Sequence, residues 1–217
     1  MIHQDYIMRM IEQLTNVLAK IFFKKETKNY NEALTDINTA SKTIVGLDLN
    51  LLEKLSADDI RSLLRIAGDD STICVKFITI AKLVKEKTDI LQLISQDNPE
   101  FISNYQKAIS LYLEGMLNNK NTEIDLSRFY QDVKEIVNVL KDEINPETRF
   151  KLFKFYSQSG KYSLAANELF RLKEKNYPGI EEAGISFFRN LEKLSEDDLR
   201  KGNPSIEEVS RGIKDFI

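Results

Sequence analysis

Apolar side chains recur at intervals of three and four residues along most of the chain. In residues 4–24, Ile7, Leu14 and Ile21 are seven apart, and further apolar residues fill the turns between them. This spacing places the apolar side chains on one face of an α-helix. Long windows lack the alternation of apolar and polar residues that is typical of a half-buried strand. The pattern therefore predicts an all-α protein.

Local signals indicate where the helices begin and end. Gly46 follows a helical pattern and is a suitable C-cap. Ser56 precedes Asp59 at the capping-box distance, and Asn145-Pro146 is a strong helix start. The expected helices cover residues 4–24, 29–45, 56–68, 71–86, 99–117, 126–140, 180–194 and 204–217, with a helix pair in 146–179 and shorter helical segments in 47–54, near 90–94 and from 195.

A Tyr-x-x-Ala-x-x-x-apolar spacing occurs three times, beginning at Tyr30, Tyr105 and Tyr162. A small residue in this place allows a neighbouring helix to approach closely. Ordinary helix amphipathicity also generates such spacings, so the pattern leaves open whether the three copies are repeats. In either case it predicts helices that pack side by side as hairpins.

The copy within residues 146–179 resembles a tetratricopeptide repeat. Leu152, Tyr156 and Gly160 match the first helix and the turn of that repeat, and Ala165 matches the small position of its second helix. Arg149 departs from it, because a large apolar residue is usual there. The resemblance implies an antiparallel helix-hairpin stack, an irregular tetratricopeptide-like α-solenoid. Its concave face would bear the candidate partner-binding groove, formed by Glu147, Phe150, Lys154, Ser157 and Gln158.

The segment Asp5-Tyr6-Ile7-Met8-Arg9-Met10-Ile11-Glu12-Gln13-Leu14 resembles the N-terminus of an uncharacterised all-helical family of Firmicutes proteins. The resemblance implies a fold and no chemistry. It draws attention to the polar side of the first helix, which is either a solvated edge or a docking surface. The residues of this candidate docking or dimer helix are Asp5, Tyr6, Arg9, Glu12 and Gln13.

The Asn-rich stretch after residue 117 has the composition of a linker. We therefore expect an N-terminal helical region in residues 1–117, a linker in 118–125 and a tetratricopeptide-like region in 126–217. The alternative is that both regions pack as one domain.

The balance of charges limits the class of partner. The 217 residues include 31 basic and 34 acidic ones, and the net charge is −3. Nucleic-acid binders usually show a basic excess or a basic face, so we expect no nucleic-acid partner. The lysines cluster in two short stretches, which we interpret as solvated helix ends or faces: Lys24, Lys25 and Lys28 in one, and Lys82, Lys85 and Lys87 in the other.

The sequence gives no sign of export or of a membrane span. The charges Asp5, Arg9 and Glu12 interrupt the first residues, so we expect no signal peptide. Cys74 is the single cysteine, and its apolar neighbours predict a buried, inert thiol. We expect a cytoplasmic protein without a membrane-spanning helix.

No established catalytic or cofactor motif is present. One histidine, His3, and one cysteine make a zinc site unfavourable, and there is no glycine-rich phosphate loop. Acidic pairs occur at Asp58-Asp59, Asp69-Asp70 and Asp197-Asp198, each at an expected helix start where capping accounts for it. We predict no enzyme, cofactor or metal; a metal-dependent hydrolase built on these pairs is a remote alternative.

These observations favour a non-catalytic scaffold that binds a protein or peptide segment on a helical concave face. The alternative is a structural homodimer joined through the first helix, because its stripe of Ile7, Leu14 and Ile21 must be buried against some partner.

Overall fold

The computed structural model describes residues 2–66, 68–95, 99–120, 124–195, 197, 199, 202 and 204–216. All the regular structure in these residues is helical, and the helices pack against one another, so the prediction of an all-α fold is confirmed. The chain divides into two compact units, residues 1–143 and residues 144–217. Each unit is described below by itself.

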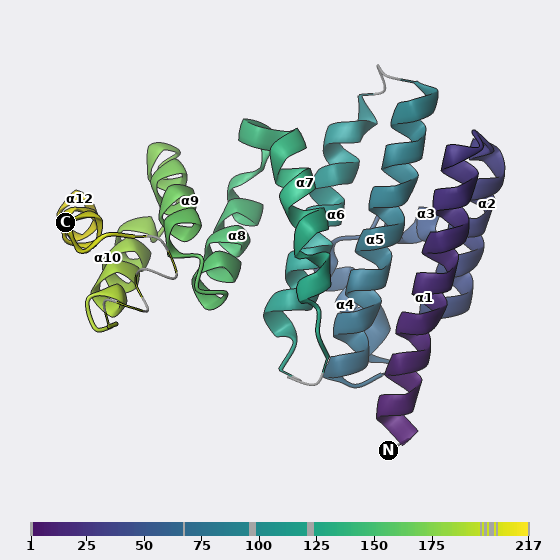
Figure 1. Cartoon of the computed structure of the whole chain (residues 1–217), viewed down its shortest axis with the longest axis horizontal. Coiled ribbons are helices and arrows are strands. Elements are labelled where there is room, and N and C mark those ends of the chain that lie inside the picture. Colours follow the sequence, from purple (N-terminus) through teal and green to yellow (C-terminus); the bar gives the residue numbers. More distant parts are fainter. Residues whose placement is uncertain are drawn as a thin grey trace. The chain divides into compact units, whose positions relative to one another are not determined.

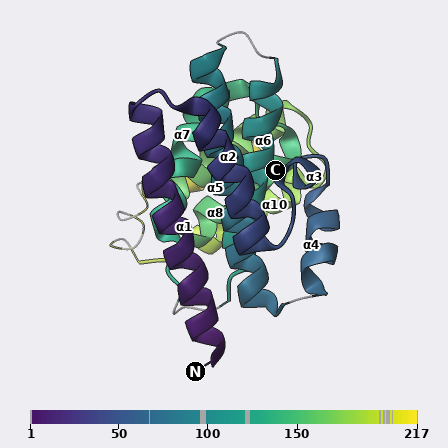
Figure 2. The same cartoon turned by 90° about the vertical axis from the view of Figure 1, so that its right-hand side faces the viewer.

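Unit 1 is built around one long helix, α5 (Asp70–Ile94). Its buried residues lie on nearly all sides, as expected for a central helix. It packs against α1 (Ile2–Glu26), α2 (Tyr30–Ala40) and α6 (Glu100–Asn118). Figure 1 shows α5 between α1 and α6, and Figure 2 shows α1 and α2 side by side in front of α5.

Short helices complete unit 1. A π-helical turn, Ser41–Val45, extends α2 and ends at Gly46, whose φ of +88° confirms it as the helix terminus. The helices α3 (Leu49–Leu52), α4 (Ala57–Arg65) and α7 (Tyr130–Leu140) follow, the last preceded by the 3₁₀ turn Ser127–Phe129 and followed by the 3₁₀ turn Lys141–Glu143.

The alanines of the repeated Tyr-x-x-Ala spacing lie at helix contacts, as their size predicts. Ala33, Ala108 and Ala165 are all fully buried. Gly115 continues the spacing in α6, and a Cβ atom there would lie 2.9 Å from the carbonyl oxygen of Cys74. The backbones of α5 and α6 therefore approach so closely that no side chain fits between them.

Unit 2 consists of α8 (Pro146–Gln158), α9 (Tyr162–Glu174), α10 (Ile180–Leu191) and α12 (Ile206–Phe216). The hairpin of α8 and α9 turns at Gly160, whose φ is +68°, and Lys161 N donates to Tyr156 O at 2.8 Å. Phenylalanine rings fill the space between α9, α10 and α12. Phe216 lies against Gly184, and Phe188 lies against Gly212, so each glycine makes room for a ring from the other helix.

The start signals of the helices are confirmed. Ser56 Oγ accepts from Asp59 N at 3.0 Å, and Asp59 Oδ2 accepts from Ser56 N at 3.2 Å, which completes the capping box. Asp69 caps α5, and Asn145 caps α8 with Pro146 at the first helical position. The expected short helix from residue 195 lies largely outside the described residues.

The expected break between 71–86 and 90–94 is wrong, because α5 runs through it without interruption. The polar residues at the expected break are paired within the helix or with its neighbours. Lys85 pairs with Asp89 one turn later, and Thr88 Oγ1 donates to Val84 O at 2.7 Å. Lys87 pairs with Glu53, the residue after α3, at 2.7 Å.

The division between the units falls at residue 143, beyond the linker expected at 118–125. Asn118 still belongs to α6, and residues 121–123 lie outside the described part. The contacts of α7 explain the difference. Tyr112 Oη donates to Asp132 Oδ2 at 3.0 Å, and Lys82 Nζ donates to the other oxygen of the same carboxylate at 2.8 Å, so α7 is joined to α5 and α6.

Candidate functional site

A groove between α8 and α10 is the candidate functional site of unit 2. Its volume is about 470 Å³, within the range of roughly 300–1,000 Å³ that is typical of ligand sites. The wall from α8 and the start of α9 consists of Phe150, Phe153, Lys154, Ser157 and Tyr162. The wall from α10 and the residues after it consists of Ala183, Ser186, Phe187, Asn190, Leu191 and Leu194.

Helix geometry places the groove-lining side chains of α8 on one face of that helix. Phe150, Phe153, Lys154 and Ser157 follow one another at intervals of three, one and three residues, which brings them to one face of α8. The N-cap at Asn145 sets the start of that helix: its Oδ1 accepts from Thr148 N at 2.8 Å. Most of the groove lining is therefore held by the regular helices α8 and α10.

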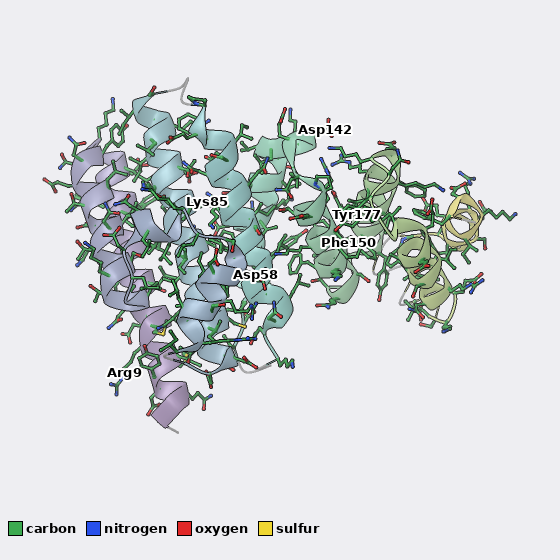
Figure 3. All side chains as sticks on the ribbon, turned by 180° about the vertical axis from the view of Figure 1, so that it is seen from behind. Arg9, Asp58, Lys85, Asp142, Phe150 and Tyr177 are labelled. Carbon is green, nitrogen blue, oxygen red and sulfur yellow. The ribbon has the colours of Figure 1, made fainter. Side chains whose placement is uncertain are left out.

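Aromatic rings form the apolar part of the groove. Phe153 and Phe187 meet edge to face with their centroids 5.4 Å apart, which fixes the spacing of α8 and α10. Phe150 also contacts Tyr177, at 5.3 Å between centroids. Figure 3 shows Phe150 and Tyr177 next to each other. Ring contacts with Phe153, at 5.8 Å between centroids, and with Tyr177 hold Phe150 in place, so the groove is preformed.

The structure brings three of the five sequence-predicted groove residues together. Phe150, Lys154 and Ser157 line the groove, whereas Glu147 and Gln158 are exposed outside it. The residues contributed by α10 were not predicted. The apolar spacing of Phe187, Leu191 and Leu194 is a signal that could have found them. Whether these residues bind a partner stays a prediction.

The predicted docking helix has a different environment. Asp5, Tyr6, Arg9, Glu12 and Gln13 are all exposed on α1, and Figure 3 shows Arg9 pointing away from the helix. Gln13 lines a groove of about 280 Å³ between α1 and α2, together with Val17, Lys20, Thr39, Thr43 and others. The other four residues do not line this groove. Their role stays a prediction.

The apolar stripe of α1 is used within the chain. Ile7, Leu14 and Ile21 are at most 2% exposed. The large apolar side chains that α1 leaves exposed lie elsewhere on the helix. Phe22 is 65% exposed and Phe23 is 67% exposed, and Tyr6 and Met8 are also exposed.

A network of ion pairs links α5 to its neighbours in unit 1. Lys85 is almost buried and contacts Asp89 at 2.9 Å and Glu135 at 3.1 Å. Lys82 contacts Asp132 at 2.8 Å and Glu86 at 3.1 Å. The network extends to α1 through Lys25, whose Nζ lies 3.0 Å from Glu86, and to α6 through Tyr105, which donates to Asp89 at 2.8 Å.

Burial and the neighbouring charges shift the pKa values of this network in opposite directions, and the effect of the charges is the larger one. Burial lowers the pKa of Lys85, but the surrounding carboxylates of Asp89, Glu135 and Asp132 raise it well above its ordinary value. Burial raises the pKa of Glu86, but Lys82 and Lys25 hold it below the ordinary value. The pKa values of Lys82 and Lys85 are thus raised, and both lysines stay charged and paired. The network stabilises the packing of α1, α5 and α7.

The interpretation of the lysine clusters as solvated faces needs correction. Lys82 and Lys85 belong to the partly buried network, and Lys24 pairs with Asp36 at 2.8 Å. Lys82 and Lys85 each have one partner a turn later in α5. The spacing of the lysines could not reveal the partners Asp132, Glu135 and Asp36, which come from other helices. Among the described lysines of these two clusters, Lys28 alone forms no ion pair, and it lies after the end of α1.

One residue of each of the first two acidic pairs takes part in helix capping. Asp59 and Asp69 accept hydrogen bonds at the starts of α4 and α5, and Asp198 lies outside the described residues. Among the described residues, no three His, Cys, Asp or Glu side chains are grouped so that they could hold a metal ion.

Cys74 is buried between α5 and α6, as its neighbours predict. Burial raises the pKa of its thiol to about 11. A thiol with this pKa carries almost no thiolate at neutral pH, and only the thiolate is nucleophilic. Cys74 is therefore a packing residue.

These features define a class: an all-helical protein with an aromatic groove on helical walls. The chain belongs to a family of unknown function, DUF6483, whose model matches residues 1–217. The resemblance of the N-terminus to an uncharacterised all-helical family is confirmed to that extent. Comparison with curated proteins and with solved structures gave no match. Among the described residues, no helix is both long and apolar enough to cross a membrane.

Proposed function

We propose that this protein is a non-catalytic interaction scaffold that binds a segment of another protein in the groove between α8 and α10. The observation that carries the proposal is the groove itself. It is preformed by Phe150, Phe153 and Phe187, and it bears exposed polar side chains beside these rings. Grooves that recognise peptides combine these two features: apolar pockets give affinity, and a few polar groups fix the orientation of the segment.

We also infer that α8 and α9 form a tetratricopeptide-like unit. The support is local: α8 and α9 are antiparallel, the chain turns at Gly160, and Ala165 is fully buried. Arg149, at a position that is usually apolar, is compensated by Glu168 of α9, whose Oε2 lies 2.9 Å from Arg149 Nη1. The charge that departs from the repeat pattern is thus paired across the hairpin.

The state of the cysteine and of the lysines supports a cellular compartment and a class of partner. We infer a cytoplasmic protein, because its one cysteine is buried as a free thiol and no disulfide supports the fold. We infer no nucleic-acid partner, because Lys24, Lys25, Lys82 and Lys85 are paired with carboxylates of the same chain.

Capture of partners from the native host by two matched variants tests the groove. Ser157→Trp fills the groove, whereas Gln158→Trp adds the same bulk at the next, exposed position outside it. Captured proteins are compared by mass spectrometry, and circular dichroism establishes that both variants keep their helicity. We expect Ser157→Trp to lose partners that Gln158→Trp and the natural chain retain. Equal capture by all three proteins would refute binding in the groove.

A homodimer through α1 is the second candidate, and the exposure of Phe22 and Phe23 is the observation that favours it. Large apolar side chains so exposed at adjacent positions are typical of an interface. Deletion of α1 would not test it, because the buried stripe of α1 belongs to the core of the same chain. Light scattering of Phe22→Ser/Phe23→Ser against the natural chain is the test, and a mass equal to one chain in both would exclude the dimer.

A further inference from the structure

The groove between α8 and α10 carries charge of one sign. Of its described lining residues, Lys154 alone is charged, and the others are aromatic, aliphatic or small and polar. Lys154 is exposed, and its Nζ lies 4.6 Å from the centroid of the Phe150 ring. No described carboxylate forms an ion pair with it, unlike the lysines of unit 1. The cation is therefore available to a partner.

Lys154 lies next to the aromatic rings that form the apolar part of the groove. It lies directly after Phe153 and one turn after Phe150, so the cation stands beside the aromatic rings. A partner that places a large apolar side chain against the rings brings its next residues close to Lys154. A carboxylate there gains a charge-assisted contact, whereas a second cation is repelled.

The groove continues on both sides of Lys154. Phe150 lines it one turn before the lysine, and Ser157 lines it one turn after. The segment that occupies it can therefore pass the cation and continue, which favours the side-chain carboxylate of Asp or Glu over the carboxylate of a chain end. The hydroxyl of Ser157 and the side-chain amide of Asn190 can form hydrogen bonds to the backbone of an extended segment.

We propose that the groove between α8 and α10 binds an internal, acidic segment of another protein, in which Asp or Glu stands beside a large apolar residue. The apolar side chain packs against Phe150, Phe153 and Phe187, and the carboxylate pairs with Lys154. This inference rests on the proposed function and adds the chemistry of the partner to it.

Selection from random short peptides tests the inference without knowledge of the partner. The peptides are displayed within a loop of a carrier protein, so that neither end is free, and are selected on the immobilised full-length chain. The selected sequences are then synthesised with acetylated and amidated ends, and their binding is measured by fluorescence anisotropy. We expect enrichment of Asp or Glu next to Phe, Leu or Trp.

Four variants separate the contributions. We expect Lys154→Met to raise the dissociation constant roughly threefold and Lys154→Glu about tenfold, because the lysine is exposed and its ion pair is partly screened. Higher ionic strength should reduce the effect of both. Ser157→Trp should abolish binding. Lys214→Glu makes the same change of charge as Lys154→Glu, at an exposed lysine of α12 outside the groove, and should leave binding unchanged.

The outcomes distinguish this inference from the proposed function. Suppose that Ser157→Trp abolishes binding but the selected peptides lack an acidic excess, or that Lys154→Glu binds as Lys214→Glu does. The groove then binds peptides, and the acidic partner is refuted. If no selected peptide loses binding to Ser157→Trp, the groove is not the binding surface, and both proposals fall.

Discussion

Arg149 and Glu168 form an ion pair between α8 and α9 that is almost closed to solvent. The side chains are 1% and 6% exposed, and the pairing atoms are 2.9 Å apart. A buried charge that loses its partner keeps the cost of leaving water and loses the attraction that offset it. We therefore expect Glu168→Leu or Arg149→Met alone to destabilise the hairpin strongly, by about 3–5 kcal/mol.

The double variant distinguishes this explanation from a simple loss of packing. Arg149→Met/Glu168→Leu removes both charges and places an apolar side chain at position 149, where the tetratricopeptide pattern usually has one. Exchange of a buried pair for apolar residues of similar size is often neutral or stabilising, so the double variant should be more stable than either single variant. Arg171 is a control: it contacts Glu168 at 3.7 Å but is 44% exposed, and Arg171→Ala should cost less than about 1 kcal/mol.

Hydrogen exchange measured by mass spectrometry is the suitable assay. It reports the free energy of local opening for peptides from α8 and α9 separately from those of unit 1. Exchange should become faster in α8 and α9 for each single variant and recover in the double variant, with no change in α5. If the two single effects add in the double variant, the pair is not coupled and the reasoning is refuted.

Three further changes have defined outcomes. Gly115→Ala should destabilise unit 1 by about 1–3 kcal/mol, because its Cβ would lie 2.9 Å from a backbone oxygen of α5; unchanged hydrogen exchange in α5 and α6 would contradict this. Cys74 should resist a thiol reagent at mildly alkaline pH, below its pKa of about 11, until denaturant is added; rapid reaction of the folded chain would show that it is accessible. The lowered pKa of Glu86 contributes stability above the ordinary carboxyl value of 4.5, and this stability is lost as the pH falls through the folded value. Urea unfolding should show a weaker loss of stability on acidification for Glu86→Gln, and an identical pH dependence would exclude the contribution.

Features set by neighbouring residues were the most predictable from the sequence. The capping box of Ser56 and Asp59 and the start of α8 at Asn145 depend on local hydrogen bonds, which residue spacing specifies. The helical period likewise identified α1 and the buried positions Leu14 and Ile21.

Features that depend on contacts between distant segments were less predictable. The expected break lay in the polar stretch after residue 86, where Lys87 pairs with Glu53, a residue far away in the sequence. The sequence identified Lys154 on α8, but the opposite wall of the groove, which includes Phe187 and Asn190, comes from α10. The amphipathic pattern shows that a helix has an apolar face, and only the fold shows which helix covers it.

Site-specific photo-crosslinking in the native host tests the central claim most directly. A photoreactive phenylalanine analogue replaces Ser157, which lines the groove, or Gln158, the next residue, which is exposed outside it. The account predicts a discrete adduct with another protein from position 157 and none from position 158. Adducts of equal yield from both positions, or none from position 157, would contradict the claim that this groove binds a partner.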